Sequence, residues 1–321
     1  MTTTTWVVGA GGLLGSAVVR TLMKENQSVY TSRPIDWAGP HASRDLATEL
    51  SGLIRAAGTG TWQIFWCAGA GVTDSDPVRL EQEILVLRTF LDLLAQLTPS
   101  RLLSGSVVLA SSAGAVYGGA AGAPFTETSA VRPLGHYGAA KLQAEVELER
   151  LSRQTGISIL IGRISNLYGP GQSLIKRQGL ISMLCFSTVT RIPISIYVPI
   201  DTLRDYIYVD DCSRILVACG QRLISRGSDR VRHMKIICSG QAVSVAAVLG
   251  QFRQVSGSRP LVIMGASPAA TLQARDLRLR SEYWPDLDLA TQTTFSAGIR
   301  QTIDQMRLDW LQPGRLAHFG T

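Results

Sequence analysis

The chain has 321 residues and a formal net charge of +7, from 31 Lys and Arg against 24 Asp and Glu. A hydrophobic fraction of 45% beside a charged fraction of 17% excludes intrinsic disorder, and the length allows one large or two modest domains with an ample core. No Lys/Arg run is longer than two residues, so the positive charge suits a site for anionic small molecules at least as well as a DNA groove. We therefore expect no nucleic-acid partner.

The cysteines, histidines and uncharged stretches bear on compartment and metal content. Five cysteines, odd in number and mostly in apolar surroundings, are typical of a reducing compartment. The four histidines are far apart and no Cys/His pair has zinc-ligand spacing, so we predict no metal. Gly or Pro interrupts every uncharged stretch, so we expect neither a membrane helix nor a signal peptide. These features predict a cytoplasmic protein with no membrane partner.

Short apolar runs alternate with long amphipathic ones through the first half of the chain. The runs with the length and composition of buried strands are residues 6–8, 28–30, 63–66, 107–109 and 157–161. The helical candidates are residues 13–25, 46–57, 79–97 and 137–155. This alternation predicts βαβ units, and hence a parallel sheet with helices on both faces. A further strand at 235–238 and shorter helices beyond residue 243 follow.

A glycine-rich turn links the first predicted strand to the first predicted helix. Gly9, Gly12 and Gly15 make the pattern G-x-x-G-x-x-G, because Leu14 fills the sixth place of the commoner G-x-G-x-x-G. Backbone N–H groups and the positive helix end favour a pyrophosphate there, and glycine lets it approach because it has no Cβ. A plain tight turn gives the same pattern, but its place in the first βαβ unit favours a dinucleotide site.

The end of the second predicted strand bears on which dinucleotide is bound. Ser32 and Arg33 lie there, with no carboxylate before Asp36 to hold the ribose hydroxyls of NAD. A hydroxyl with an arginine suits a 2′-phosphate and favours NADP over NAD, although a surface arginine lying over the adenine fits the sequence nearly as well. Asp45 and the adjacent Leu46 are either adenine contacts or the N-cap of the next helix.

Tyr137 and Lys141 are four residues apart and so share one face of a predicted helix. The pKa of an unperturbed tyrosine is about 10, and a nearby cation favours the phenolate and lowers that pKa. Such a tyrosine can exchange a proton with a sugar hydroxyl while a nicotinamide exchanges the hydride. A surface lysine after a packed tyrosine has the same spacing. The pair, however, opens the helix that follows the carboxyl end of a strand, where ligands gather in α/β sheets.

Two hydroxyl groups follow the strand at residues 107–109, which we take as the fifth of the sheet. Ser111 and Ser112 can polarise a reacting oxygen by donating a hydrogen bond to it. The alternative is a Ser/Gly-rich turn whose hydroxyls bond to backbone groups.

Several motifs in chain order together resemble the extended short-chain dehydrogenase/reductases, and within that superfamily the nucleotide-sugar epimerase/dehydratase family. The resemblance covers nearly the whole chain. It implies an α/β fold with a Rossmann-like doubly wound parallel sheet and a smaller C-terminal substrate-binding lobe. The motifs are Gly9-x-x-Gly12-x-x-Gly15, Ser111-Ser112 with Val116-Tyr117-Gly118, Tyr137-x-x-x-Lys141, Arg163-x-x-Asn166-x-Tyr168-Gly169-Pro170-Gly171 and Arg204-Asp205-Tyr206-x-x-x-Asp210-Asp211.

The resemblance also implies how the chain is divided and assembled. Residues 1–170 with 205–242 would form the NAD(P)-binding domain, and residues 171–204 with 243–321 the nucleotide-sugar lobe. A homodimer would form through two helices of each subunit. The helix at residues 79–97 would be one of them, because it is apolar around most of its circumference and so is expected to be buried on more than one side.

By the same resemblance, individual residues are expected to contact cofactor or substrate. The expected cofactor contacts are Gly9, Gly11, Gly12, Leu13, Leu14, Gly15, Ser32, Arg33, Asp45, Leu46, Cys67, Ala68, Gly69, Ala110, Tyr137, Lys141 and Ile164. The expected substrate contacts are Ala113, Asn166, Arg204 and Asp276. Arg204 would meet the substrate diphosphate, and its plainer interpretation is an ion pair with an aspartate of an adjacent strand.

Two departures from the family pattern bear on the reaction. Gly114 and Ala115 stand where related 4,6-dehydratases have Asp-Glu, so dehydration of the sugar is not expected. Ala113 takes the place of the usual catalytic Ser or Thr. Ser112 or Ser111 must then supply the hydroxyl through a small shift of the loop.

A third departure is Glu83, which stands where similar proteins carry an Asn, but Tyr137 and Lys141 are intact. We therefore predict an NAD(P)-dependent nucleotide-sugar epimerase, which oxidises C4 transiently and returns the hydride to the other face of the sugar. An NADPH-dependent 4-ketoreductase would use the same residues once, and a non-catalytic dinucleotide-sensing module is the third hypothesis. Loops at residues 176–190 and 193–201 are expected to select the sugar, which the sequence does not name.

Overall fold

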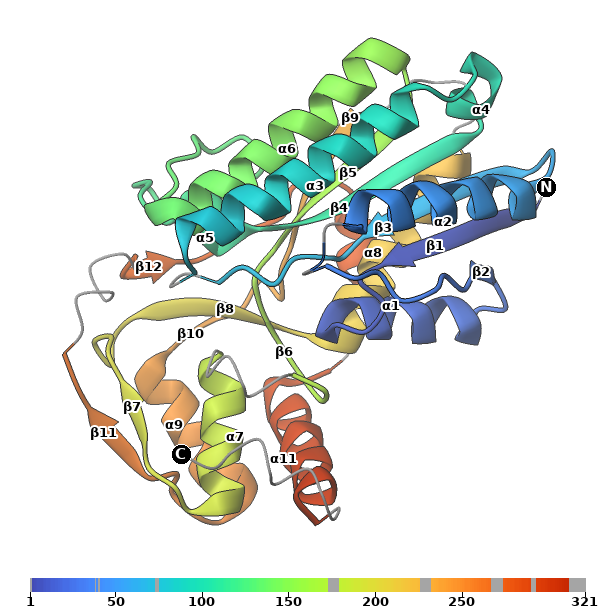
Figure 1. Ribbon diagram of the computed structural model, residues 1–321. Coiled ribbons are helices and arrows are strands. Elements are labelled where there is room, and N and C mark those ends of the chain that lie inside the picture. Colours follow the sequence, from blue (N-terminus) through green and yellow to red (C-terminus); the bar gives the residue numbers. More distant parts are fainter. Residues whose placement is uncertain are drawn as a thin grey trace.

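The computed structural model describes residues 2–311 except 38, 40, 73–74, 173–178, 226–231, 267–273 and 290–292. The strands of its main sheet are β1 (Thr3–Val8), β2 (Ser28–Tyr30), β3 (Thr61–Trp66), β4 (Gly105–Ser112), β5 (Ser158–Ile164) and β9 (Arg232–Ile237). They pair in the order β2-β1-β3-β4-β5-β9 and every pairing is parallel (Figure 1). The predicted α/β fold with a Rossmann-like parallel sheet is confirmed. The strand that leads into Ser111 and Ser112, β4, is the fourth in the chain and not the fifth.

Helices cover both faces of this sheet, as the alternation of strands and helices predicts. One face carries α1 (Leu13–Lys24) and α8 (Val209–Ser225), which pack on each other. The other face carries α2 (Ala42–Ala57), α3 (Pro77–Ala95) and α6 (Gly135–Thr155), with α3 and α6 side by side (Figure 1). The sheet is therefore doubly wound.

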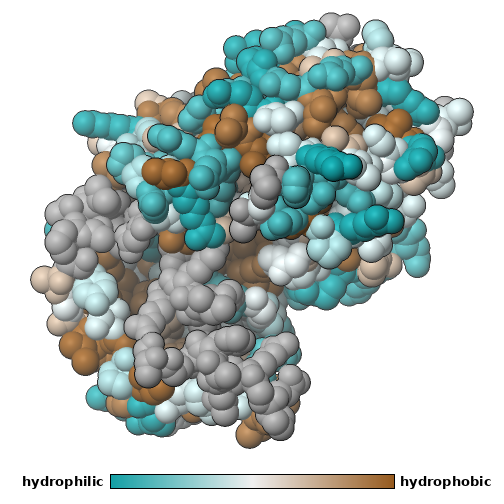
Figure 2. All heavy atoms as spheres, in the orientation of Figure 1, coloured by the Kyte–Doolittle hydropathy of each residue, from teal (hydrophilic) through white to brown (hydrophobic). Residues whose placement is uncertain are grey.

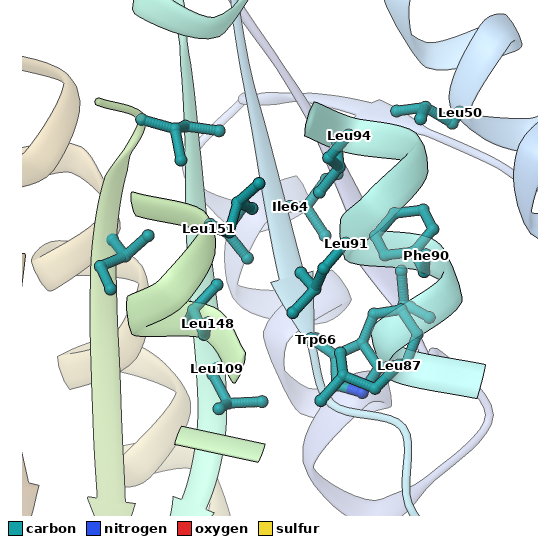
Figure 3. Packing of buried hydrophobic residues seen from close by; sticks show 14 of the residues in the cluster. Leu50, Ile64, Trp66, Leu87, Phe90, Leu91, Leu94, Leu109, Leu148 and Leu151 are labelled. Atoms are coloured by element: carbon teal, nitrogen blue, oxygen red, sulfur yellow. The ribbon is translucent and has the colours of Figure 1, made fainter. Parts of the chain in front are cut away.

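Large apolar side chains fill the space between the sheet and the α3–α6 pair (Figure 3). Phe90 and Leu91 of α3 and Leu148 of α6 are at most 1% exposed, and Ile64 of β3 is fully buried. Burial of apolar surface stabilises the fold by about 25 cal/mol per Å², so this layer fixes α6 against the sheet. The first turn of α6, which carries Tyr137, is held in place by the packing of its later turns.

Three helices begin earlier than predicted: α6 begins at Gly135, and α3 and α2 begin as follows. α3 begins directly after Asp76, whose side chain caps the helix by accepting a hydrogen bond from the backbone N–H of Val78 at 3.0 Å. α2 begins at Ala42, so Asp45 lies inside its first turn and the interpretation of Asp45 as the N-cap is wrong. Hydrophobic periodicity does not locate either start, because the first turn of each helix is partly exposed.

A second group of elements is centred on β8 (Leu203–Tyr208). It pairs antiparallel with β10 (Ala242–Ser244) and parallel with β12 (Asp276–Leu277) and β6 (Asn166–Tyr168). The helices α7 (Leu180–Thr190), α9 (Val245–Ser256) and α11 (Phe295–Leu311) pack into a core with its aromatic side chains (Figure 1). The remaining elements are β7 (Ile194–Ile196) paired with β11 (Val262–Met264), α4 (Pro99–Leu103), α5 (Ala113–Tyr117) and α10 (Pro285–Asp288).

One of the two predicted specificity loops is largely helical. Residues 180–190 form α7, whereas residues 176–178 lie outside the described part of the chain. The loop at 193–201 contains the short strand β7. Within the described ranges no helix is long and apolar enough to span a membrane, and no group of three or more His, Cys, Asp or Glu side chains is placed to hold a metal ion.

Candidate active site

The glycine turn between β1 and α1 is closely packed on one side and open on the other. Gly9 has φ +87°, and a Cβ on it would lie 2.7 Å from the backbone N of Ala68. A Cβ on Gly15 would overlap the carbonyl oxygen of Gly9, whereas a Cβ on Gly11 would meet nothing within 4 Å. α1 begins after Gly12 with no side chain capping its first N–H groups. An open backbone at the positive end of a helix fits the diphosphate of a dinucleotide.

Other predicted cofactor contacts lie at the carboxyl ends of the neighbouring strands. Cys67 directly follows β3 and donates its backbone N–H to the carbonyl of Val8 at 2.9 Å, which brings Ala68 and Gly69 beside the glycine turn. Burial raises the pKa of the Cys67 thiol to about 12, so the thiol is neutral there. Ala110 and Ile164 lie near the ends of β4 and β5 at the same edge, with Ser112 opposite Ile164 in the pairing.

The residues predicted at the ribose and adenine end differ in exposure. Ser32 is half-buried and Arg33 exposed, just beyond the end of β2. A carboxylate oxygen of Asp45 accepts a hydrogen bond from the backbone N–H of Asp36 at 3.4 Å. Leu46 is fully buried in the core between α2 and the sheet. Its side chain is therefore part of the core and is not available to a ligand.

Tyr137 and Lys141 lie together on one face of α6, as their spacing predicts. The Nζ atom of Lys141 is 5.8 Å from the centre of the Tyr137 ring, and both side chains are half-buried. They face the segment that follows β3: a Cβ on Gly69 would be 3.5 Å from Nζ of Lys141, and a Cβ on Gly71 3.6 Å from the ring of Tyr137. The pair thus lies at the same edge of the sheet as the glycine turn.

The two candidate serines at the end of β4 have different surroundings. The buried hydroxyl of Ser111 donates to Glu145 at 2.5 Å, so its proton is already used. Ser112 is half-buried and accepts a hydrogen bond from the backbone N–H of Ala115 at 3.4 Å, which caps α5 and leaves its own proton for another oxygen. Ala113 is fully buried in the core. The structure therefore favours Ser112 over Ser111 as the available hydroxyl and offers Ala113 no surface for a substrate contact.

Sequence reasoning missed the carboxylate that engages Ser111. Glu145 continues the four-residue spacing of Tyr137 and Lys141 on α6, and forms a buried ion pair with Arg163 of β5 at 2.7 Å. Arg163 in turn donates to the phenol oxygen of Tyr117 at 2.7 Å. The spacing of Glu145 was a usable signal, because a third residue at i+8 lies on the same helix face.

Arg204 on β8 is a buried cation. It is 8% exposed, and its guanidinium donates to the carbonyl of Leu203 at 2.8 Å. Asp276 lies opposite Leu203 on the adjacent strand β12, yet it pairs with Arg278 at 2.8 Å. In the described part of the chain Arg204 forms no ion pair, so the plainer interpretation of this residue does not hold. Burial lowers the pKa of its guanidinium, as expected for a cation held out of water.

The remaining predicted substrate contacts lie on either side of Arg204. Asn166 of β6 is half-buried and donates its side-chain amide to the carbonyl of Asp205 at 2.9 Å. The Asp205 carboxylate is fully buried and accepts from the backbone N–H and the hydroxyl of Ser239, both at 2.9 Å. Asp276 borders a cavity of about 270 Å³, which is lined by residues 118–123, Phe125 and residues 274–276.

The six-stranded parallel sheet is Rossmann-like, and it carries the glycine turn and the Tyr137–Lys141 pair at its carboxyl edge. The model of the NAD dependent epimerase/dehydratase family matches residues 5–229. The chain therefore belongs to this family.

Two curated relatives match part of the chain. The dTDP-4-dehydro-6-deoxyglucose reductase of Escherichia coli is 37% identical over 105 residues, which is 33% of each chain. A putative UDP-glucose 4-epimerase of Methanocaldococcus jannaschii is 33% identical over 108 residues, which is 34% of this chain and 35% of the relative. The matched segment thus spans about a third of the length of these relatives.

Two solved structures match over nearly the whole chain. MoeE5 in complex with UDP-glucose and NAD is 25% identical with a TM-score of 0.76, over 95% of this chain and 99% of that one. RMD from Pseudomonas aeruginosa complexed with NADPH is 20% identical with a TM-score of 0.74, over 96% and 99%. The second likeness shows the fold alone.

Proposed function

We propose that the protein is an NAD(P)-dependent enzyme that epimerises the sugar of a sugar nucleotide at C4. The observation that carries the proposal is the position of Tyr137 and Lys141, which share one helix face and lie at the same sheet edge as the glycine turn. Membership of the epimerase/dehydratase family and the epimerase and reductase among the relatives support this class of reaction.

A nicotinamide dinucleotide is the proposed cofactor. The turn at Gly9, Gly11 and Gly12 would hold its diphosphate, since the turn is open at Gly11 and leads into the start of α1. The exposed Arg33 next to Ser32 supports NADP, while the structural relatives hold NAD in one case and NADPH in the other. When bound, the nicotinamide supplies hydride exchange with a carbon of the sugar.

Three side chains would handle the proton at the reacting oxygen. Ser112 would donate a hydrogen bond to the C4 oxygen of the sugar, because among the described residues its hydroxyl only accepts a hydrogen bond. Tyr137 would remove the proton of the C4 hydroxyl and later return it. Lys141 would place a positive charge beside the phenol during this transfer, since its Nζ is 5.8 Å from the centre of the ring. Inversion at C4 requires the 4-keto sugar to turn over in the site and present its other face before Tyr137 returns the proton to the C4 oxygen.

The second group of elements would hold the sugar nucleotide. Arg204 is a buried cation that forms no ion pair among the described residues, and a substrate diphosphate would supply the missing anion. Asn166 and Asp276 lie on strands next to β8 and would contact the same ligand. We propose residues 171–204 with 243–321 as the sugar-nucleotide lobe and residues 1–170 with 205–242 as the cofactor domain.

A 4-ketoreductase is the second candidate. It would use Tyr137, Lys141 and Ser112 once and consume NADPH. The exposed Arg33 beyond β2 favours it, and so does the E. coli reductase that is 37% identical over 105 residues.

A homodimer through α3 and α6 is proposed from their outer surface. Val78 and Leu85 of α3 are each 58% exposed, and Val146 of α6 is 54% exposed. Apolar side chains interrupt the hydrophilic surface over these two helices (Figure 2). Packing a second copy on this face would remove the apolar surface from water.

The test is to incubate the purified protein with UDP-, GDP- and dTDP-sugars, and with a 4-keto sugar nucleotide plus NADPH. An epimerase gives isomerised sugar without net absorbance change at 340 nm, which supports the first proposal. Loss of NADPH absorbance with the keto sugar alone supports the reductase instead. No turnover with any of these ligands, while a dinucleotide still binds, contradicts both and supports a non-catalytic dinucleotide-binding module.

A further inference from the structure

Glu83 lies close to the charged end of Lys141. On α3, one carboxylate oxygen of Glu83 accepts a hydrogen bond from the backbone N–H of Ala70 at 2.9 Å. Its other oxygen, Oε2, lies over the neighbouring Gly69: the position of a Cβ on Gly69 is 3.6 Å from Oε2 and 3.5 Å from Nζ of Lys141. The carboxylate of Glu83 and the ammonium of Lys141 therefore both lie close to the backbone of Gly69, which has no side chain to separate them.

The same carboxylate also lies near Tyr137. The position of a Cβ on Gly71 is 3.3 Å from Oε2 of Glu83 and 3.6 Å from the Cδ2 atom of the Tyr137 ring. The carboxylate, the ammonium and the phenol ring are thus arranged around the backbone of Gly69 and Gly71, which have no side chains. In the described ranges Glu83 and Lys141 are not in direct ion-pair contact, so each charge still acts on its surroundings.

Two carboxylates of α6, the helix that carries Lys141, are already paired. Glu147 of α6 binds Arg88 of α3 at 2.9 Å, further along both helices. Glu145 of α6 binds Arg163 of β5 at 2.7 Å. Cys67, at the end of β3, is a neutral thiol because burial raises its pKa to about 12. Glu83 is thus the carboxylate among these groups whose charge is left to oppose Lys141.

We propose that Glu83 is a positioning residue of the Tyr137–Lys141 pair: its carboxylate draws the Lys141 ammonium over residues 69–71 and offsets part of the positive charge at Tyr137. This inference rests on the proposed function for its catalytic consequence, but the charge effect does not require a substrate. A negative charge near a phenol disfavours its ionised form, so removing the charge of Glu83 is the change that tests this role.

The first test is a tyrosinate titration near 295 nm, which needs neither substrate nor turnover. The spectrum of a protein with Tyr137 minus that of the same protein with Tyr137→Phe isolates this phenol from the other tyrosines. We expect Glu83→Gln to lower the pH midpoint of the Tyr137 signal by roughly 0.5 to 1 unit, because the two groups are half-buried neighbours. Gln retains the oxygen that accepts from Ala70, so a purely structural role predicts no shift.

Two further variants complete the titration. Glu81→Gln is the matched control, since Glu81 is exposed on the same helix, and it should leave the midpoint unchanged. Glu83→Ala removes the same charge with a smaller side chain and should reproduce the shift if the Gln variant does not fold. A midpoint that stays in place, or moves up, in the neutral Glu83 variants would overturn the proposal.

The second test applies to the turnover reaction. The acidic limb of the pH profile of kcat/KM should move down by the same amount in Glu83→Gln. The two proposals can fail separately: a shifted titration in a protein that turns over no sugar supports the role of Glu83 and contradicts the epimerase. An active enzyme whose acidic limb does not move contradicts the role of Glu83 alone.

Discussion

The hydrogen bonds of the two hydroxyls at the end of β4 decide whether Ser111 or Ser112 can assist the reaction. Ser111 donates to a buried carboxylate, whereas Ser112 accepts from a backbone N–H and keeps its proton available. We expect Ser112→Ala to lower kcat about 100-fold, a typical effect of removing one hydrogen-bond donor from a reacting oxygen. Ser111→Ala should keep kcat but lower the free energy of unfolding by roughly 1–2 kcal/mol, because buried Glu145 loses a donor.

Steady-state kinetics and urea unfolding of both variants measure these effects. Equal losses of kcat in the two variants, with equal stability, would show that the hydroxyl of Ser111 also reaches the substrate.

The cysteines provide a prediction about pH. Burial raises the pKa of the Cys67, Cys219 and Cys238 thiols to about 12, and those of Cys185 and Cys212 are also raised. The thiolate is the reactive form, so at pH 8 roughly one thiol in ten thousand would be ionised for a pKa near 12. Reaction of the folded protein with a disulfide reagent should be very slow at pH 8 and should accelerate as the pH rises.

Counting modified thiols before and after unfolding in urea tests this. Five fast-reacting thiols are expected only in the unfolded chain. Rapid modification of any of the four buried cysteines (Cys185, Cys212, Cys219 and Cys238) in the native protein would contradict the burial described for it.

At the scale of elements, one ion pair ties α6 to two strands. Glu145 of α6 and Arg163 of β5 are 3% and 4% exposed at their side chains, and Ser111 of β4 bonds to the same carboxylate. Removing one partner leaves a buried charge without compensation, so Glu145→Ala should reduce the free energy of unfolding by roughly 3–5 kcal/mol. The double variant Glu145→Met with Arg163→Met should cost less, since no charge remains buried.

A double-mutant cycle of Glu145→Met and Arg163→Met, measured by urea unfolding, gives the coupling free energy of the two side chains directly. Additive losses from the two single changes would mean that the pair contributes nothing beyond its separate side chains, contrary to this interpretation.

Features that depend on residues close together along the chain could be predicted from the sequence. Features that depend on contacts between residues far apart along the chain could not. The glycine turn and the spacing of Tyr137 and Lys141 are local patterns, so both could be located before the structure was known. The choice between Ser111 and Ser112 depends on Glu145, 34 residues further along the chain. The absence of an ion-pair partner for Arg204 in the described ranges likewise depends on how β12 pairs with β8.

At the scale of the whole molecule, the proposed dimer predicts that a charge placed in its contact lowers the mass of the assembly from that of a dimer to that of a monomer. Leu85 of α3 is 58% exposed in the single chain and would be buried in the dimer. Leu85→Arg should place a charge in that contact and yield monomers in sedimentation velocity. Leu308→Arg is the matched control, because Leu308 is 59% exposed on α11, away from α3 and α6, and should leave the dimer intact. A monomeric parent protein, or a dimeric Leu85 variant, would contradict this contact.

The central claim is that Tyr137 and Lys141 serve a hydride exchange at C4 of a sugar nucleotide. NMR of the reaction in D₂O tests it most directly, with the sugar nucleotide that the substrate panel identifies. The account predicts a product inverted at C4 that retains protium there, since the hydride returns to the carbon it left, and Tyr137→Phe should slow the conversion at least about 100-fold. Deuterium at C4 of the product, or undiminished conversion by the Phe variant, would contradict it.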